Sequence, residues 1–225
     1  MASKTQLATT GEQQASLVIN NSFIDGLTKQ LEEKTKYGLS FPKDYNLSNA
    51  LMGAYLTLKE TKDKNNKPIL EACSQISIAN SLMNMATLGL SVQKKQGYFI
   101  SYGSQCQFQR SYFGNITIAR RYGMKDIHAE IIYQGDKFKY HIEDGNKVLD
   151  SHEQDFMNID NDKILGAYAV VQMEDGSKHL EVMNMKQIKQ SWSQGYGYKE
   201  NGNGTHQKFT DQMAKKTVIN RALKQ

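Results

Sequence analysis

Long apolar segments and cysteine pairs are both missing from this 225-residue sequence. No run approaches the roughly 18 apolar residues of a membrane-spanning helix, and the first 22 residues lack the apolar stretch of about 7 to 15 residues that a secretory signal requires. The two cysteines, Cys73 and Cys106, exclude a disulfide framework, and with five scattered histidines they form no recognisable zinc spacing. We therefore expect a protein without a membrane span, in the reducing cytoplasm.

The usual catalytic signatures are missing as well. There is no G-x-x-x-x-G-K-[ST] loop to cradle nucleotide phosphates, so the sequence gives no reason to expect ATP hydrolysis. There is no G-x-S-x-G elbow, and His152-Glu153 lacks the second histidine of H-E-x-x-H. We expect a protein that is not an enzyme and has no cofactor, while a dependence on divalent cations stays open.

Acidic residues gather between residues 144 and 181, and a metal-dependent nuclease needs carboxylates that converge on metal ions. This enzyme is therefore one alternative that the sequence keeps open. Turn chemistry accounts for Asp144, Glu174 and Asp175. Five further acids are expected in a solvated loop, and they are Asp150, Glu153, Asp155, Asp160 and Asp162.

Charge is distributed unevenly along the chain, whose 28 Lys+Arg and 23 Asp+Glu give a formal net charge of +5. Residues 94–125 carry six basic residues and no acid, and residues 186–225 carry eight bases and two acids. Residues 126–185, between them, hold thirteen acids and five bases. Two basic blocks on either side of an acidic one predict a polar molecule with a cationic face that attracts a polyanion. Solubility alone is the other interpretation.

The N-terminal 22 residues are rich in Thr, Gln, Ser and Ala and lack an apolar period, which favours a flexible arm over residues 1–22. Residues 23–225 are expected to form a single domain. The last helical pattern is unbroken at Gln225, so a further C-terminal region beyond it stays open.

Apolar residues at helical spacing predict six helices. They cover residues 23–36, a segment from Ser48, residues 70–88, 111–123 and 185–193, and a segment from Thr210. Ser22 with Asp25 resembles a capping box for the first helix, and Ser48 and Thr210 are the expected N-caps of the second and the last. Gly89 stands where a C-terminal glycine cap is expected.

Alternating patterns predict an antiparallel sheet. Its strands cover residues 98–103, 105–110, 127–133, 137–142, 164–173 and 178–183. The first two strands are joined at Gly103-Ser104, a plausible tight turn. Residues 194–205 are rich in glycine and asparagine and predict a mobile loop. The expected fold class is therefore α+β.

Binding of single strands requires a cationic track for phosphates and flat side chains on which bases stack. The first basic block interleaves its cations with aromatic residues, of which some are expected in the core and others against bases. In the glycine-rich segment, Trp192, Tyr196 and Tyr198 are interpreted as residues that stack on bases or contact a neighbouring subunit. Gln105, Gln107 and Gln109 alternate to one face of a strand, where they offer uncharged hydrogen bonds or simply a soluble surface.

Two segments resemble phage RecT-type single-strand annealing proteins. They read LGLSVQKKQGYFISYGSQCQFQRSYFGNITIARR (residues 88–121) and FTDQMAKKTVINRALK (residues 209–224). The resemblance rests on an L-G-L entry before a Y-F-I-x-Y-G hairpin, a Gln-rich second strand and a K-K-T-x-I-x-R helix, in this order. It covers roughly residues 25–225 and implies a strand-strand-strand-helix annealing core with additional N- and C-terminal helices.

The resemblance implies an ATP-independent protein of phage recombination that coats single-stranded DNA as an oligomer, pairs it with a complementary strand and holds the annealed duplex. It implies a ring or a helical filament, a 5'-3' exonuclease partner, the host single-strand binding protein as a further partner, and a phage- or prophage-encoded protein in the bacterial cytoplasm. A passive coat that binds single strands without pairing them is the competing binding function.

The expected DNA contacts lie mainly in the two basic segments. Lys215, Lys216 and Arg221 are predicted to contact the tightly held strand. The full predicted set is Lys94, Lys95, Gln105, Gln107, Gln109, Arg110, Tyr112, Arg120, Arg121, Lys208, Lys215, Lys216, Thr217, Arg221 and Lys224.

Overall fold

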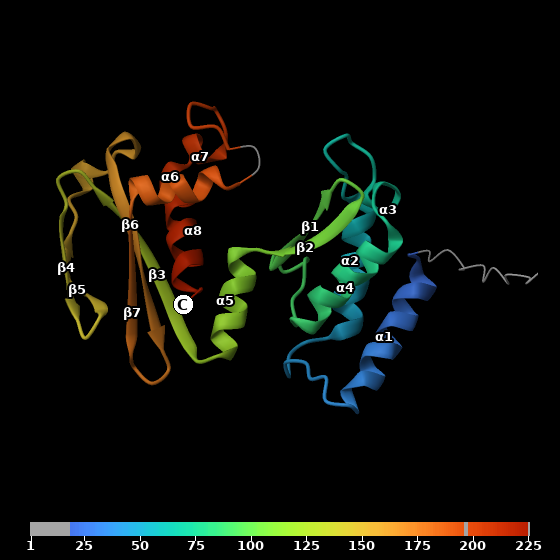
Figure 1. The fold of residues 1–225 in the computed structure, drawn as a ribbon. Coiled ribbons are helices and arrows are strands. Elements are labelled where there is room, and N and C mark those ends of the chain that lie inside the picture. The colour runs from blue at the N-terminus through green and yellow to red at the C-terminus, as the bar shows by residue number, and fades with distance from the viewer. Residues whose placement is uncertain (1–18, 196–197, 225) are drawn as a thin grey trace, which may run out of the picture. The chain divides into compact units, whose positions relative to one another are not determined.

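The computed structural model describes residues 19–195 and 198–224. Most of the expected flexible arm, and Tyr196 in the expected glycine-rich loop, lie outside the described residues. Helices and antiparallel strands occur together in one chain, which confirms the expected α+β class (Figure 1).

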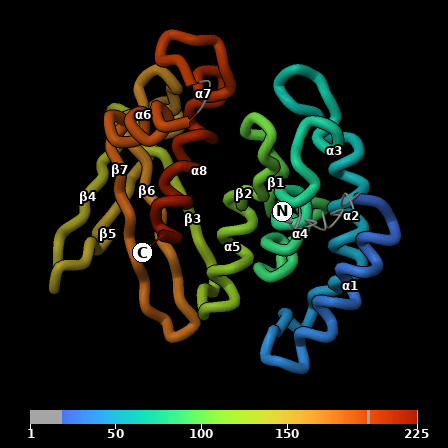
Figure 2. The backbone as a smooth tube through the Cα atoms, turned by 45° about the vertical axis from the view of Figure 1, so that its right-hand side comes forward, coloured from blue at the N-terminus to red at the C-terminus, as the bar shows by residue number. Residues whose placement is uncertain are grey.

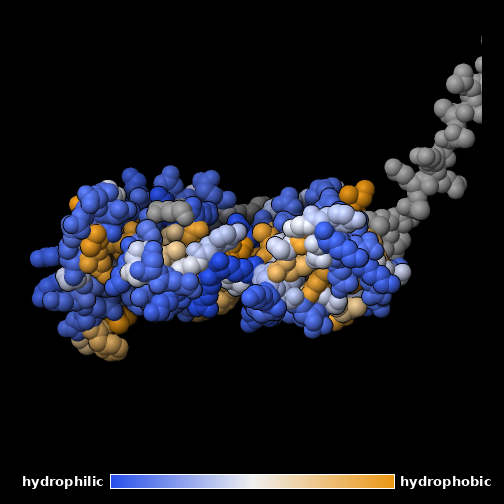
Figure 3. Space-filling view, turned by 90° about the horizontal axis from the view of Figure 1, so that it is seen from below, coloured by the Kyte–Doolittle hydropathy of each residue, from blue (hydrophilic) through white to orange (hydrophobic). Residues whose placement is uncertain are grey.

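The described residues form two compact units. We call residues 19–93 with 99–109 the N-terminal unit, and residues 94–98 with 110–224 the C-terminal unit. Viewed from below, apolar side chains interrupt the hydrophilic surface of each unit (Figure 3).

Helices and one β-hairpin make up the N-terminal unit. Its elements are α1 (Asn21–Thr35), α2 (Leu47–Glu60), α3 (Ile69–Ala72), α4 (Gln75–Thr87), β1 (Gly97–Tyr102) and β2 (Gln105–Arg110). The first two residues of β1 and the last residue of β2 belong to the C-terminal unit. Leu51 in α2 and Leu82 in α4 are completely buried. The rings of Phe99 and Phe108 lie 5.7 Å apart between centroids on the buried face of the hairpin. The expected turn at Gly103 is confirmed, with a φ of 61°.

The expected caps of the first two helices are wrong by two residues. Asn20, rather than Ser22, caps α1 by accepting a hydrogen bond from the Phe23 N–H, at 2.9 Å. Asn46, rather than Ser48, caps α2 in the same way. Asparagine and serine are comparably good N-caps, so residue type alone did not choose between neighbouring candidates.

The single helix expected over residues 70–88 is in fact two helices, α3 and α4. Ser74 interrupts them: its hydroxyl accepts from the Ser77 N–H, and its own N–H donates to the Ser104 carbonyl, at 2.8 Å. A serine that caps a helix in this way has left the helical conformation, and Ser74 has ψ 137°. The glycine cap at the other end is confirmed, because Gly89 has φ 61°.

A three-stranded antiparallel sheet in the order β3-β6-β7 organises the C-terminal unit. The strands are β3 (Met124–Tyr133), β6 (Ile164–Met173) and β7 (Lys178–Asn184), and the helices are α5 (Tyr112–Arg121), α6 (Met185–Ser193), α7 (Thr205–Lys208) and α8 (Thr210–Ala222). A hairpin of β4 (Lys137–Glu143) and β5 (Asn146–Glu153) lies beside β7 (Figure 2), and the short helices η1 (Phe156–Asn158) and η2 (Asn161–Lys163) follow it.

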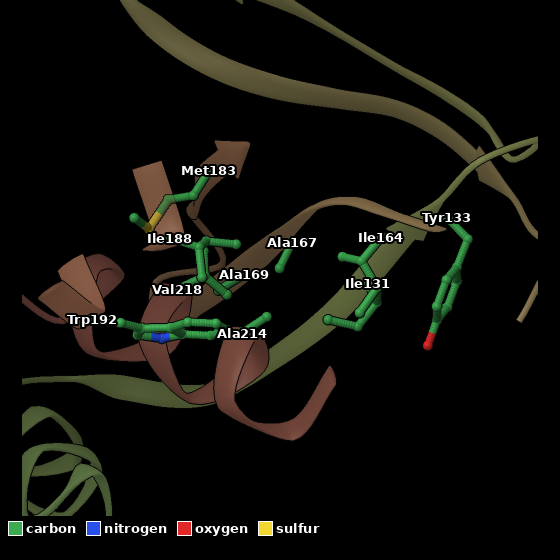
Figure 4. Packing of buried hydrophobic residues seen from close by; sticks show 10 residues of the cluster. All are labelled: Ile131, Tyr133, Ile164, Ala167, Ala169, Met183, Ile188, Trp192, Ala214 and Val218. Carbon is green, nitrogen blue, oxygen red and sulfur yellow. The ribbon is translucent and has the colours of Figure 1, made fainter. Parts of the chain in front are cut away.

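Helices α6 and α8 cover one face of the β3-β6-β7 sheet and bury its main core (Figure 4). Ala214 and Val218 of α8 are completely buried there, as is Ile188 of α6. Trp192 belongs to this core, with 7% of its surface exposed, so our placement of it in a loop is corrected. It is the second-last residue of α6, where the helical apolar stripe still points inward.

Two further expectations for this unit are wrong. Asp150 and Glu153 lie in strand β5 rather than in a solvated loop. Their carboxylates have partners across the hairpin, where Asp150 Oδ1 lies 2.7 Å from His141 Nδ1 and Glu153 Oε2 lies 3.0 Å from Lys137 Nζ. Thr210 begins α8 but does not cap it, because Phe209 is the N-cap residue and the Thr210 hydroxyl donates to the carbonyls of α7.

Candidate nucleic-acid interface

The predicted DNA contacts fall on three stretches of the structure. Gln105, Gln107 and Gln109 lie in β2, in the N-terminal unit. The others belong to the C-terminal unit. Lys94 and Lys95 lie just before β1, Arg110 ends β2, and Tyr112, Arg120 and Arg121 lie in α5. Lys208, Lys215, Lys216, Thr217, Arg221 and Lys224 lie in α7 and α8 or directly after α8.

The row of three glutamines is confirmed as one exposed face of β2. The strand alternates exposed glutamines with the buried residues Cys106 and Phe108. The Gln109 amide donates to the hydroxyl of Tyr102 on the paired strand. The amides of Gln105 and Gln107 therefore stand on the same face as an already formed polar pair.

The start of α5 gathers the basic residues that precede it. Ser111 caps the helix: its hydroxyl accepts from the Gly114 N–H and donates to the Lys95 carbonyl, at 2.6 Å. Its N–H donates to the Gln96 carbonyl, at 3.1 Å. These bonds hold the backbone of Lys95 next to Ser111, which directly follows Arg110. Cations from two separated stretches of sequence therefore share one end of α5.

Tyr112 and Asn115 of α5 meet Lys216 and Asn220 of α8, and we call these four residues the α5–α8 seam. Lys216 Nζ lies 5.8 Å from the centroid of the Tyr112 ring, within cation–π range. The Asn115 amide donates to Asn220 Oδ1, at 3.0 Å. Burial raises the pKa of the Tyr112 hydroxyl, with a further contribution from Tyr98, so this hydroxyl stays protonated and able to donate at neutral pH.

The other two predicted cations of α8 are paired with carboxylates of the sheet. Lys215 Nζ lies 2.7 Å from Glu130 Oε2 on β3. Arg221 Nε lies 3.3 Å from Glu181 Oε1 on β7, and the Glu181 side chain is only 5% exposed. Glu181 Oε2 also lies 3.3 Å from Lys147 Nζ of β5. The cations that the sequence presents as equivalent therefore differ, because two of them already face a negative charge and Lys216 faces an aromatic ring.

The Thr217 hydroxyl makes two hydrogen bonds within the fold. It accepts from the Trp192 indole N–H, at 2.7 Å, and donates to the Met213 carbonyl, at 2.7 Å. This pair of bonds fastens α6 to α8. Tyr198 and His206 pack against the same indole, with ring centroids 5.9 and 4.8 Å from it. Lys208, Arg120 and Lys224 are exposed.

A cavity of about 420 Å³ lies where α5, the sheet and the end of α8 come together in the C-terminal unit. The sequence did not predict this cavity. The one available signal was the helical spacing of Asn115, Ala119 and Tyr122, which places three of its lining residues on one side of the chain. Its lining residues are Arg110, Asn115, Ile118, Ala119, Tyr122, Met124, Val171, Met173, His179, Ala222, Leu223 and Lys224. Among these described residues there is no aspartate or glutamate, while two are cations.

No three His, Cys, Asp or Glu side chains gather as a metal site within residues 19–195 and 198–224. Burial raises the pKa of the Cys106 thiol to about 11, so this cysteine is protonated at neutral pH and is a poor nucleophile. In the same described residues, none of the helices has the length and hydropathy needed to cross a bilayer.

Comparison with known proteins agrees with the resemblance seen in the two basic segments. The chain is 24% identical to Protein RecT of Escherichia coli (strain K12), over 98% of this chain and 81% of that protein. It is 29% identical to Uncharacterized protein YqaK of Bacillus subtilis (strain 168) over 71% of this chain, a match that spans about half (54%) of that relative. The model of the RecT family matches residues 48–225, and the chain therefore belongs to the RecT family.

Proposed function

We propose that this protein binds single-stranded DNA on a cationic surface, pairs it with a complementary strand without ATP and holds the nascent duplex. Membership of the RecT family supports a role in DNA recombination by single-strand annealing. The observation that carries the finer proposal is the α5–α8 seam with its adjoining cavity. There Lys216 lies over Tyr112, and Arg110 and Lys224 line a pocket that has no acidic residue among its described lining.

Electrostatics explains why such a surface would speed annealing. Two single strands repel each other through their phosphates, and cations that hold one backbone lower this repulsion. Exposed amides such as those of Gln105 and Gln107 offer hydrogen bonds that favour no particular base. Sequence specificity is then left to base pairing itself, and the protein needs neither a nucleotide nor a catalytic residue.

The wider setting of this proposal comes from the family. We propose a homo-oligomer, as a ring or a helical filament, that works with a 5'-3' exonuclease and with the single-strand binding protein of a bacterial host, in the cytoplasm. The basic blocks and the acidic block along the chain suit contacts between copies, because opposite charges can meet across a subunit interface.

The salt dependence of single-strand binding tests the cationic surface. If each subunit neutralises about six phosphates, log K should fall with log[salt] at a slope near −4. Fluorescence anisotropy of a labelled oligonucleotide over a salt series measures this slope. A response that is flat in salt would contradict the proposed surface, whereas a passive coat would give the same slope without speeding duplex formation. A nuclease would shorten the oligonucleotide in magnesium, and a chelator would abolish the shortening.

Lys215 and Lys216 are adjacent in sequence but are expected to contribute unequally to DNA binding. Lys216→Ala should weaken single-strand binding about fivefold at about 0.1 M salt and reduce the salt slope by about 0.7. Lys215→Ala should cost less, because Glu130 already neutralises much of that charge. Both variants should keep the helical content of the wild type. Equal losses for the two variants would show that the contacts seen in the structure do not rank these lysines.

A further inference from the structure

The cavity next to the end of α8 is lined by apolar side chains of the sheet and of α5. Helix α8 stops at Ala222, whereas the antiparallel pairing of β3 with β6 continues as far as Met124 and Met173. These two methionines and Val171 line the cavity, together with Ile118 of α5. Figure 1 shows the end of α8, next to the label C, standing against strands that extend past it. Met124 and Val171 are buried, so the apolar surface that a flat group can reach is formed by the partly exposed Met173 and Ile118.

The rim of this cavity has a different character. Arg110 and Lys224 supply two positive charges, and none of the described lining residues is an acid. Tyr122, also in the lining, is 80% exposed, so its ring is accessible for stacking. Methionine side chains are polarizable and make favourable contacts with aromatic rings. The complementary ligand is therefore an anion with a flat, apolar body.

We propose that this cavity binds one unpaired nucleotide of the DNA strand, with the base against the methionine-lined interior and the phosphate at Arg110 and Lys224. The proposal rests on the proposed function and specifies the form of DNA that the site selects. About 420 Å³ lies within the usual range for one small ligand. A base can enter the cavity only if it is unpaired. The free energy of unstacking a base is lowest in a single strand, where no base pair has to be broken.

This arrangement would distinguish single strands from the annealed product. A base in the cavity is released when its complement arrives, because pairing and insertion compete for the same base. The cavity then contributes to the affinity for single strands but not to the affinity for duplex. Phosphate contacts, in contrast, are made with both forms.

The test combines cavity variants with abasic oligonucleotides. Ala119→Phe fills the cavity and Tyr122→Ala removes its exposed ring, while Tyr37→Ala removes a ring that is 88% exposed in the N-terminal unit and serves as the control. Binding is measured by anisotropy with an intact single strand, the same strand with regularly spaced abasic sites, and a duplex. Circular dichroism verifies that each variant is folded.

Each cavity variant should lose about tenfold in affinity for the intact strand, with an unchanged salt slope. Affinity for the abasic strand and for the duplex should be unchanged, and Tyr37→Ala should behave as wild type. Equal losses on intact and abasic strands, or no loss at all, would overturn the cavity proposal. A change in oligomeric state with no preference for intact strands would instead show that a second copy of the chain occupies the cavity. Failure of the wild type to bind any of the oligonucleotides would overturn the proposed function itself.

Discussion

Replacing Arg110, Lys216 and Lys224 together by alanine should weaken single-strand binding about 100-fold at about 0.1 M salt. Each phosphate contact with a single strand adds about 0.7 to the salt slope, which is about fivefold in affinity at this salt concentration. Three lost contacts therefore reduce the slope by about 2. Arg110 and Lys224 line the cavity, whose described lining residues include no acid, and Lys216 lies over Tyr112. Within the described residues, no contact seen in the structure places any of the three opposite a carboxylate.

The matched control carries the same change in net charge. Lys137→Ala, Lys139→Ala and Lys163→Ala also lower the formal net charge by three from +5, and these lysines are exposed on β4 and η2 of the same unit. Their ion pairs with Glu153 and Asp160 lie on the surface and contribute little to stability. Similar losses in the two triple variants would show that binding follows overall charge rather than the α5–α8 seam and its cavity.

The largest expected effect on stability is at Asp136, in the turn between β3 and β4. Its side chain has no exposed surface. One carboxylate oxygen accepts from the Tyr133 N–H at 2.8 Å and the Gln154 amide at 3.0 Å, and the other accepts from Asn158. His152 Nε2 lies 3.2 Å away and connects this carboxylate to β5. Asp136→Ala would remove this acceptor from the Tyr133 N–H, the Asn158 amide and the His152 ring, and should cost about 3 kcal/mol in free energy of unfolding.

The pH dependence of this contribution follows from the pKa of Asp136. Burial by itself would raise it, but the hydrogen bonds from Gln154, the Tyr133 N–H and His152 outweigh burial and hold the pKa below its ordinary value. A carboxyl group whose pKa is lower in the folded state stabilises the fold above its unfolded pKa, about 3.9. This stabilisation is lost as the pH falls through the folded pKa.

Urea unfolding followed by circular dichroism at pH 7 and at acidic pH measures both effects. The difference between wild type and Asp136→Ala should be largest at neutral pH and shrink below about pH 4. Glu153→Ala is the control, because its carboxylate is 68% exposed and its ion pair with Lys137 is screened by solvent and contributes little to stability. Equal unfolding midpoints for Asp136→Ala and Glu153→Ala at pH 7 would contradict the role given to this turn.

Local patterns predicted much of this fold. The bounds expected for the strand at 164–173 and the helix at 185–193 agree with β6 and α6, because a complete period-2 or helical pattern is visible there. Strand β5 was not predicted because most of its residues are polar or charged, a composition that is typical of a loop. The break at Ser74 was missed because apolar spacing continues across it, and the partner of its N–H, Ser104, lies in another element.

The candidate site was predicted in its composition but not in its geometry. Sequence patterns identified the basic residues, and the alternation in β2 placed its glutamines on one face. The pairing of Lys215 with Glu130 joins residues 85 positions apart, which no local pattern reveals. The cavity likewise needs α5, all three strands of the sheet and the end of α8 together. Contacts between residues this far apart in the sequence are set by tertiary packing alone.

Annealing of two complementary labelled oligonucleotides, followed by fluorescence energy transfer without any nucleotide, tests the proposed function most directly. The wild-type chain should form duplex faster than the protein-free reaction, the acceleration should weaken as salt is raised, and a noncomplementary pair should give no signal. Tight binding of both strands with duplex formation no faster than without protein would contradict annealing and identify a passive single-strand coat.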